Sequence, residues 1–294
     1  YAERLSYISL TGPNSHNGEV ALPREDDEDL RRWLELVSRE CPTCQGKKAQ
    51  QRWLARQLLD AFRSSAEVFA EAFGAAGLSG EEVAVIYEDS MNTGFGQSCR
   101  GYFLLQFLGY KKAAVLHGGY QAWVAESLPV STEAAIPEPK TFPLDETSSA
   151  VMLTQSDMLT SLDDDTIIKL DVRDVDEWVG TSSSPYGIDF CPRKGRIPGA
   201  VWLEWYRMMK PGEEVPMFKD QTELQAECAT VGITPESTVY LYCFKGARAS
   251  NTYVALKEAG VKDVRLYFGS WNEWSRNPDL PIESGPPAGV WAAA

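Results

Sequence analysis

The chain has 294 residues, which is enough for two domains of ordinary size, each with its own hydrophobic core. A content of 44% hydrophobic and 24% charged residues is normal for a soluble globular protein, and no apolar run is long enough for a membrane span. The net charge of −14 argues against nucleic acids and anionic membranes as partners, so an anionic ligand must be captured by local positive charge. Six scattered cysteines are too few for a disulfide scaffold. They indicate a reducing compartment, either the cytoplasm or an organelle matrix.

The N-terminal part of the chain is polar and rich in charge between residues 15 and 64. Two helices are predicted there, over residues 27–38 and 49–62. Cys41 and Cys44 have the spacing of a metal-ligand pair, but no second Cys or His pair accompanies them. Because a zinc site needs four ligands, no metal site is predicted.

Beyond this region the chain repeats itself at an offset of about 150 residues. Residues 77–87 and 232–242 each contain a glycine that ends a helix, a short loop and an apolar run rich in strand-forming residues. Both copies then close with an aromatic segment, over residues 118–123 and 269–274. Short apolar strands that alternate with helices indicate an α/β fold, in which helices flank a parallel sheet.

A proline-rich stretch with poor periodicity, over residues 130–143, separates the two copies and is typical of a linker. We therefore predict two domains, residues 1–144 and residues 145–294. The second copy opens with a strand over residues 166–171, and no equivalent is recognisable before residue 40. That strand of the first copy is either degenerate or lies upstream of Tyr1.

Cys243 directly follows an apolar strand, and a short turn through Gly246 then leads into a helix. In a parallel α/β sheet, ligands bind at the carboxyl ends of the strands. The backbone N–H groups of the turn and the start of the helix favour the thiolate form of a cysteine, and Lys245 and Arg248 add positive charge. The alternative interpretation is that Cys243 is a small buried hydrophobic residue.

Four motifs in the second copy resemble those of the rhodanese family. They cover residues 150–283, whereas the first copy matches only over residues 65–128. Asp171-Val-Arg173 resembles the family's Asp-x-Arg, Gly195–Ala200 resembles its Gly-His-Ile-Pro-Gly-Ala turn with Arg196 in place of His, Cys243–Arg248 resembles its active-site loop, and Phe268–Trp274 is similar to its Gly-Gly-Trp-x-x-Trp ending.

The resemblance implies two tandem rhodanese-like domains, of which only the second is catalytic. Glu88 stands at the cysteine position of the first copy, and a carboxylate cannot act as the sulfur nucleophile. The first domain is therefore expected to be catalytically silent and to line one side of the pocket. In the second domain the implied roles are nucleophile for Cys243, substrate binding for Phe244, Lys245, Gly246, Ala247 and Arg248, and support of the loop for Asp171 and Arg173.

The implied reaction is sulfur transfer from thiosulfate or 3-mercaptopyruvate to cyanide or a thiol, through a persulfide on Cys243 and without a cofactor. Arg248 lies five positions after Cys243, one fewer than in the cysteine phosphatases of similar fold, so the tighter loop favours sulfur over phosphate. Lys245 favours thiosulfate as donor. Glu177 stands where thiosulfate-using relatives have Arg, and the basic run at residues 193–196 compensates only if it faces the pocket.

A second class of function is a rhodanese-derived scaffold or binding subunit of a larger protein assembly, with little activity. The polar N-terminal region favours this alternative. The intact loop at Cys243 favours the enzyme, since a scaffold has no need of it.

Overall fold

The structure is a computed structural model that describes residues 5–9, 66–89, 96–132, 136–145, 150–211 and 215–286. The helices predicted before residue 65 and the Cys41–Cys44 pair lie outside these residues. The chain divides into two compact units, and the larger one comprises Tyr1–Leu10 and Ala70–Ala294. Among the residues that the structure describes, no helix is both long and apolar enough to cross a membrane.

The C-terminal half contains a five-stranded sheet in the order β4-β8-β7-β5-β6, in which all neighbouring strands are parallel. Its central strands are short runs of β-branched and aromatic residues that bury both faces, as a parallel sheet covered by helices requires. The predicted α/β architecture with a parallel sheet is confirmed. The strands are β4 (Met152–Leu153), β5 (Ile167–Asp171), β6 (Val201–Trp202), β7 (Thr238–Tyr242) and β8 (Asp263–Tyr267).

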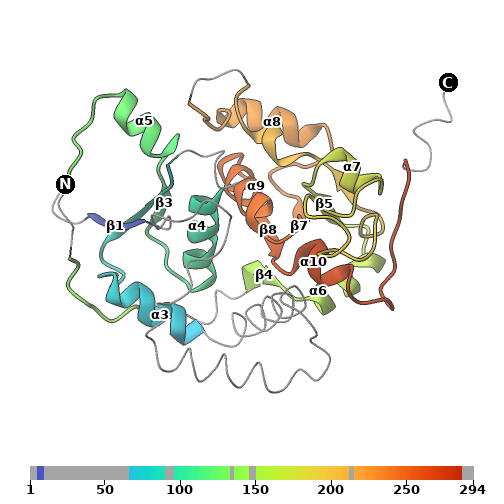
Figure 1. Ribbon diagram of the computed structural model, residues 1–294, viewed down its shortest axis with the longest axis horizontal. Coiled ribbons are helices and arrows are strands. Elements are labelled where there is room, and N and C mark those ends of the chain that lie inside the picture. The colour runs from blue at the N-terminus through green and yellow to red at the C-terminus, as the bar shows by residue number, and fades with distance from the viewer. Residues whose placement is uncertain are drawn as a thin grey trace. The chain divides into compact units, whose positions relative to one another are not determined.

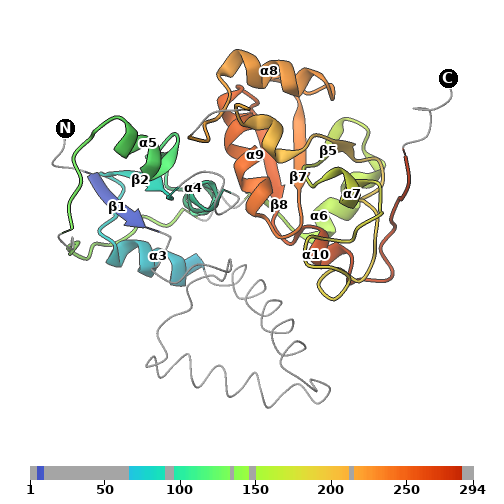
Figure 2. The ribbon, with the colours of Figure 1, turned by 45° about the horizontal axis from the view of Figure 1, so that its top comes forward.

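Helices cover both faces of this sheet (Figures 1 and 2), with α8 and α9 on one side and α6, α7 and α10 on the other. Right-handed crossovers explain the two sides, because the connections through α6 and α7 run in one direction across the sheet and those through α8 and α9 run in the other. Two short 3-10 helices, Ser161–Asp163 and Trp205–Met208, lie between these elements. The helices are α6 (Gln155–Thr160), α7 (Val175–Trp178), α8 (Gln221–Ala229), α9 (Ala247–Glu258) and α10 (Ser270–Trp274).

One cluster of buried apolar and aromatic side chains connects the sheet to α6 and α10. Trp271 and Trp274, from the aromatic motif at the end of the repeat, are fully buried in it. This cluster includes Phe244, the residue after Cys243, so the loop is anchored in the core on one side.

The N-terminal half contains a three-stranded parallel sheet in the order β1-β2-β3, flanked by further helices. The strand that the sequence left open is present: β1 pairs with β2 as β5 pairs with β7, and Ser9 occupies the register position of Asp171. The elements are β1 (Leu5–Ser9), α3 (Ala66–Ala75), β2 (Val83–Tyr87), α4 (Gln97–Phe107), β3 (Ala113–Val115) and α5 (Gly119–Ala125).

The two halves repeat individual hydrogen bonds as well as strand order. In each, the helix after the last strand donates a backbone N–H to the residue that follows the central strand, and a tryptophan indole closes the exit of the chain. The matching pairs are Tyr120 N to Glu88 O and Trp271 N to Cys243 O, at 2.9 Å each, and Trp123 Nε1 to Pro129 O and Trp274 Nε1 to Pro281 O, at 2.8 and 2.9 Å.

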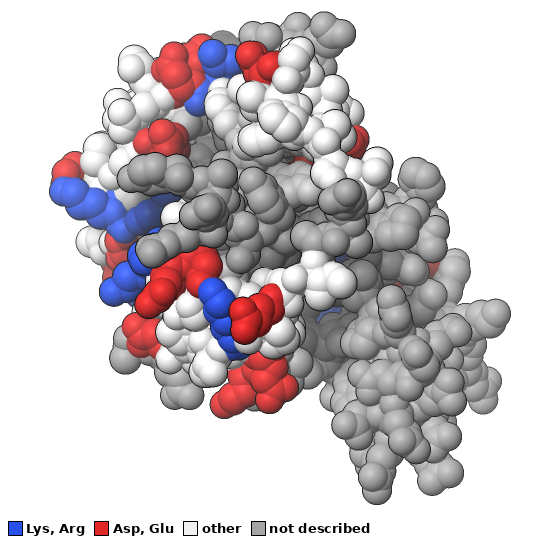
Figure 3. Space-filling view, turned by 90° about the vertical axis from the view of Figure 1, so that its left-hand side faces the viewer, with Lys and Arg blue, Asp and Glu red and all other residues white. Residues whose placement is uncertain are grey.

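Helices α4 and α9 pack against each other and so bring the two halves together. Phe103 of α4 makes an edge contact with Tyr253 of α9 and stacks on Phe268, with ring centroids 5.1 and 5.9 Å apart. On the face drawn in Figure 3, acidic side chains lie beside basic ones. Charges of both signs are therefore mixed there, which leaves the capture of an anion to groups close to its site.

Candidate active site

Gly246 shapes the loop between β7 and α9. It has a φ of 88°, in the left-handed region, and a Cβ at this position would lie 3.1 Å from the ring of Phe268. This turn directs the backbone N–H of Gly246 to the Sγ atom of Cys243 at 3.1 Å. The sulfur therefore lies at the N-terminal end of the 12-residue helix α9, where the backbone groups and the helix dipole favour negative charge.

Cys243 is held from the opposite side by the start of α10. Its backbone N–H donates to Ser270 Oγ at 3.2 Å, and its carbonyl accepts from the N–H of Trp271 at 2.9 Å. Ser270 has a φ of 54°, which is strained for a residue other than glycine, and its hydroxyl donates to the carbonyl of Tyr267. The backbone of the nucleophile candidate is thus fixed by the aromatic motif that ends the repeat.

Phe244 and Lys245 lie beneath an aromatic side chain from a distant loop. The rings of Phe244 and Tyr186 are 5.2 Å apart, and Lys245 Nζ lies 4.9 Å from the centroid of Tyr186. Lys245 is half-buried and forms no ion pair with a carboxylate of the described residues. Its charge is therefore available to a ligand, and without a ligand the aromatic faces of Tyr186 and Phe244 stabilise it.

Arg248 is not a free cation. Its Nη1 and Nη2 donate to the two carboxylate oxygens of buried Glu177 at 2.7 and 3.0 Å, and Nη1 lies 3.3 Å from Asp174 Oδ1. Burial by itself would lower the pKa of Arg248, but the hydrogen bonds and charge of Glu177 outweigh it and hold the pKa above its ordinary value. The sequence predicted an anion-binding arginine here, whereas the structure shows an arginine whose charge is already balanced.

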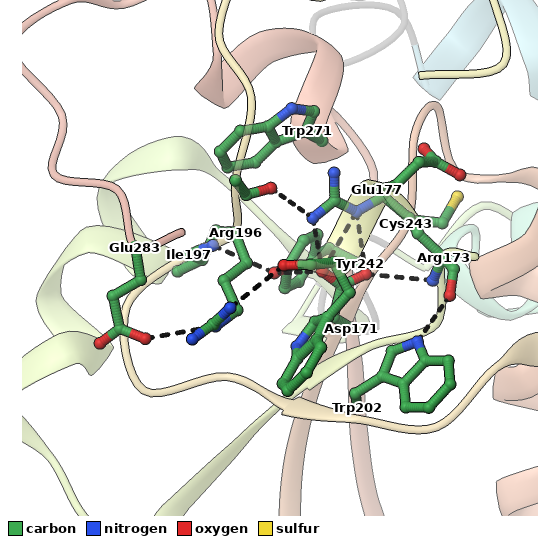
Figure 4. Close-up of polar contacts among 12 residues, drawn as sticks. Asp171, Arg173, Glu177, Arg196, Ile197, Trp202, Tyr242, Cys243, Trp271 and Glu283 are labelled. Carbon is green, nitrogen blue, oxygen red and sulfur yellow. Dashed lines mark hydrogen bonds and ion pairs between the residues drawn. The ribbon is translucent and has the colours of Figure 1, made fainter. Parts of the chain in front are cut away.

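Asp171 and Arg173 form a buried pair next to the loop (Figure 4). Arg173 Nη2 donates to Asp171 Oδ2 at 2.6 Å and to the carbonyl of Gly195 at 2.8 Å, and its guanidinium lies over the ring of Trp271. The hydroxyl of Tyr242, the residue before Cys243, donates to Asp171 Oδ2 at 2.8 Å. These contacts link the pair to the segments that contain Gly195, Trp271 and Tyr242.

The basic run at residues 193–196 is engaged with the chain's own C-terminal segment. Arg193 donates to the backbone carbonyls of Trp274, Ser275, Asn277 and Leu280. Lys194 donates to the carbonyl of Thr181, and Arg196 forms an ion pair with Glu283 and donates to the carbonyls of Trp178 and Gly285. These side chains are therefore engaged by the chain itself, which does not support the hypothesis that residues 193–196 compensate for Glu177 at the position where thiosulfate-using relatives have Arg.

Two residues of the site were not found from the sequence. Ser270 holds the backbone of Cys243, and Arg100 of α4 donates from Nη2 to the carbonyl of Lys245 at 3.2 Å. Arg100 lies 145 positions before Lys245, so no local pattern connects them. The available signal was the repeat itself, because aligning Gly96 with Gly246 places Arg100 on the helix that corresponds to α9.

In the first half, Glu88 occupies the position after the central strand. It is 1% exposed, and its carboxylate accepts from the Ser98 hydroxyl at 2.6 Å and from the backbone N–H groups of Ser98 and Gln97 at 3.2 and 3.3 Å. Burial raises the pKa of Glu88, although these hydrogen bonds oppose the shift. The start of α4 is therefore filled by a carboxylate of the chain itself.

The other described cysteines, Cys99, Cys191 and Cys228, are also buried. Burial raises the pKa of Cys191 and of Cys228 to about 11, and it raises the pKa of Cys99 further. Because the thiolate is the nucleophilic form, these three thiols are poor candidates for covalent chemistry.

Comparison with known proteins identifies the family that this chain is similar to. A model of the rhodanese-like domain matches residues 154–277. The thiosulfate sulfurtransferase of Azotobacter vinelandii is 32% identical over 213 residues, which cover 72% of this chain and 73% of the relative. The enzyme of the same name from Pseudomonas aeruginosa is 31% identical with coverages of 72% and 73%, and the sulfur carrier protein TtuD of Thermus thermophilus is 29% identical with coverages of 75% and 78%.

Among solved structures, wild-type EanB is similar, with a TM-score of 0.65 and 24% identity, over 76% of this chain and 55% of EanB. The chain thus spans a little over half the length of EanB. Another EanB structure, with a TM-score of 0.65, contains a cysteine persulfide in a tetrahedral intermediate state with ergothioneine. At this identity the likeness shows the fold.

Proposed function

Because the chain belongs to the rhodanese family and is a sulfurtransferase of the thiosulfate sulfurtransferase type, we propose that Cys243 is its nucleophile and carries the transferred sulfur as a persulfide. The observation that carries this proposal is the hydrogen bond from Gly246 N–H to Cys243 Sγ at the start of α9. Such a position stabilises both a thiolate and the terminal sulfur anion of a persulfide. Among the described cysteines, only Cys243 has it.

In the first half-reaction, the Cys243 thiolate attacks the outer sulfur of thiosulfate. A new S–S bond forms at Cys243, the S–S bond of thiosulfate breaks, and its electron pair leaves with sulfite. The charge is conserved, since a thiolate and a dianion give a persulfide anion and a sulfite dianion. The loop N–H groups remain with the sulfur that carries the negative charge, which lowers the barrier without an external oxidant or reductant.

In the second half-reaction, cyanide or a thiolate attacks the outer sulfur of the persulfide. With cyanide, a C–S bond forms, the S–S bond breaks, and the electron pair returns to Cys243 as thiolate. Thiocyanate leaves and the enzyme is restored. Because the two half-reactions share one covalent intermediate, the kinetics should be ping-pong.

We propose thiosulfate as the donor, with 3-mercaptopyruvate as the alternative. Lys245 supports thiosulfate, because its charge, which no carboxylate of the described residues pairs with, lies two residues from Cys243 and suits a dianion. Of the predicted substrate-binding residues, Phe244, Gly246 and Ala247 then act through backbone and packing, while Arg248 with Glu177 fixes the start of α9. Asp171 and Arg173 brace the loop through Tyr242 and Trp271.

We further propose that residues 145–294 are the catalytic rhodanese domain and residues 1–144 a degenerate, non-catalytic copy. The matching strand order, the matching hydrogen bonds and the equivalent position of Glu88 and Cys243 support this assignment. Glu88 cannot form a persulfide, so the first copy serves the reaction through its contacts with the second.

The decisive experiment locates the transferred sulfur. Purified protein is incubated with thiosulfate and freed of excess donor, and its peptides are then analysed by mass spectrometry. One added sulfur atom should appear on the peptide that contains Cys243, and cyanide should remove it with formation of an equal amount of thiocyanate. Sulfur that is found on Cys99, Cys191 or Cys228 instead would show that the proposed nucleophile is wrong.

A further inference from the structure

Arg100 brings a cation from the first half of the chain to the catalytic loop. Only two of the five N–H groups of its guanidinium donate to other described residues, to Gln97 Oε1 and to the carbonyl of Lys245, at 3.2 Å each. Its Nε atom is buried and has no hydrogen-bond partner. The guanidinium also lies 5.8 Å from the ring of Phe268, which covers Gly246.

No carboxylate of the described residues pairs with Arg100. This distinguishes it from Arg248, which Glu177 neutralises, and from Arg173, which Asp171 neutralises. Burial lowers the pKa of Arg100, and the nearby Cys243 and Tyr186 groups counteract this electrostatically. A half-buried cation whose donors are not all used by the described residues favours a negative group beside it. The loop of Cys243, which Arg100 contacts through the carbonyl of Lys245, is where an anionic donor would lie.

Resting on the sulfur-transfer function proposed above, we propose that Arg100 is a donor-binding residue: together with Lys245 it holds the sulfonate oxygens of an anionic sulfur donor beside Cys243. The first half of the chain thereby contributes a side chain to the substrate site, although its own loop carries Glu88 instead of a nucleophile. Donor capture then uses one cation from each half.

Charge balance explains why this contribution is needed. Thiosulfate carries two negative charges, and the chain as a whole carries −14. The loop arginine is already paired, so Lys245 alone leaves one charge of the donor without a counter-charge. Arg100, which donates to the carbonyl of Lys245, provides a second cation. Its N–H groups that no described residue accepts from can bind the sulfonate oxygens.

The test compares three variants of the full chain. Arg100→Gln removes the charge, and Arg100→Lys keeps the charge but lacks the planar guanidinium group. Arg265→Gln is the control. Arg265 pairs with Asp263 on β8, so the control changes net charge equally. Two measurements are made, steady-state kinetics with thiosulfate and with the monoanion methanethiosulfonate, and calorimetric binding of thiosulfate to the same variants in a Cys243→Ser background.

For Arg100→Gln, KM and Kd for thiosulfate should rise about 10- to 100-fold with a smaller change in kcat, the range expected for one charge-assisted hydrogen-bonding group. The rise should be smaller for the monoanion. Arg100→Lys should recover most of the thiosulfate affinity, and Arg265→Gln should match the wild type. Circular dichroism and the urea midpoint establish that each variant is folded.

A loss in kcat with unchanged KM and Kd would overturn the proposal, since Arg100 would then only brace the loop. So would a loss of thiosulfate affinity in Arg100→Lys as large as that in Arg100→Gln. If Arg100→Gln does not fold, a Kd for Arg100→Lys that has risen by about 10-fold or more decides against the proposal in its place. The binding measurement is independent of turnover. If wild-type protein bound thiosulfate through Arg100 but formed no persulfide, the sulfur-transfer function would fail while the binding role stood.

Discussion

The loops that follow β2 and β7 begin at equivalent positions in the two halves, yet the first begins with a carboxylate and the second with a thiol. In each, a strand ends and a left-handed glycine, Gly96 or Gly246, begins a helix. The N-terminus of that helix attracts negative charge in both cases. In the first half the carboxylate of Glu88 fills the position and uses the N–H groups of Gln97 and Ser98. In the second half a thiol takes its place.

The difference supports the proposal that one fold uses the same helix end for stability in the first half and for catalysis in the second. The carboxyl group of Glu88 is part of the chain and can neither leave nor react, and it already accepts from the N–H groups at the start of α4. Cys243 provides an anion only as thiolate or persulfide. Its loop has only residues 244–245 between Cys243 and Gly246, whereas the first loop has residues 89–95 between Glu88 and Gly96. The short connection keeps the N–H of Gly246 on the sulfur.

The strongest test of this comparison is removal of the nucleophile. Cys243→Ser should abolish thiocyanate formation from thiosulfate and cyanide, because an alcohol at this position is neither ionised nor able to hold a transferable sulfur. Cys228→Ala, which changes a buried cysteine with a pKa of about 11, should retain turnover and serves as the matched control. Turnover by the serine variant at the wild-type rate would contradict the role of Cys243.

Two triplets of identical sequence, Asp171-Val-Arg173 and Asp263-Val-Arg265, differ in burial. Comparing them therefore measures how burial changes the contribution of an Asp–Arg pair to stability. The first pair is fully buried, so Asp171→Ala should lower the free energy of unfolding by about 3–5 kcal/mol, the cost of leaving an arginine buried without its partner. The second pair is more than a third exposed, and Asp263→Ala should cost about 0–1 kcal/mol. Urea unfolding measures both. Equal losses would mean that Asp171 does not brace the loop.

Lys245 tests whether the loop selects its donor by charge. Lys245→Ala should lower kcat/KM for thiosulfate by roughly 10- to 150-fold, which corresponds to one charge-assisted hydrogen bond of about 1.5–3 kcal/mol. The loss should be smaller for 3-mercaptopyruvate, which carries one negative charge on its carboxylate. Lys262→Ala, which removes an exposed lysine paired with Glu236, is the control. An unchanged ratio between the two donors would show that Lys245 does not select the donor.

The α/β architecture and the position of Cys243 could be predicted because their signals are local. Apolar runs that end at a glycine turn define a strand, a loop and a helix within about fifteen residues, and the order of such units implies a parallel sheet. The four family motifs are equally compact. The strand β1 was missed as a match because its sequence keeps the strand pattern but not the Asp-x-Arg, so only the register with β2 identifies it.

Side-chain partners that are distant in sequence could not be predicted. Glu177 was noted as a departure from the family pattern, yet its role follows from Arg248, which lies 71 positions away. The sequence left open whether the basic run at residues 193–196 faces the pocket. In the structure, backbone carbonyls of residues 274–285 accept from Arg193 and Arg196. Arg100 reaches the loop because α4 packs on α9, which is a property of the tertiary fold.

The smallest expected effect concerns the ionisation of Glu88, the counterpart of Cys243. Burial holds the pKa of Glu88 above its ordinary value of 4.5, so the folded chain keeps a proton there that the unfolded chain releases. The stability that this proton contributes is complete below pH 4.5 and is lost as the pH rises through the folded-state pKa. Glu88→Gln cannot ionise. The free energy of unfolding of the wild type relative to this variant should therefore fall with rising pH, by at most about 1.4 kcal/mol per pH unit, and then level off. Urea unfolding of both proteins from pH 4 to 8 measures this difference. A difference that rises with pH would mean that the N–H groups of α4 outweigh burial and that Glu88 is a stabilising anion throughout.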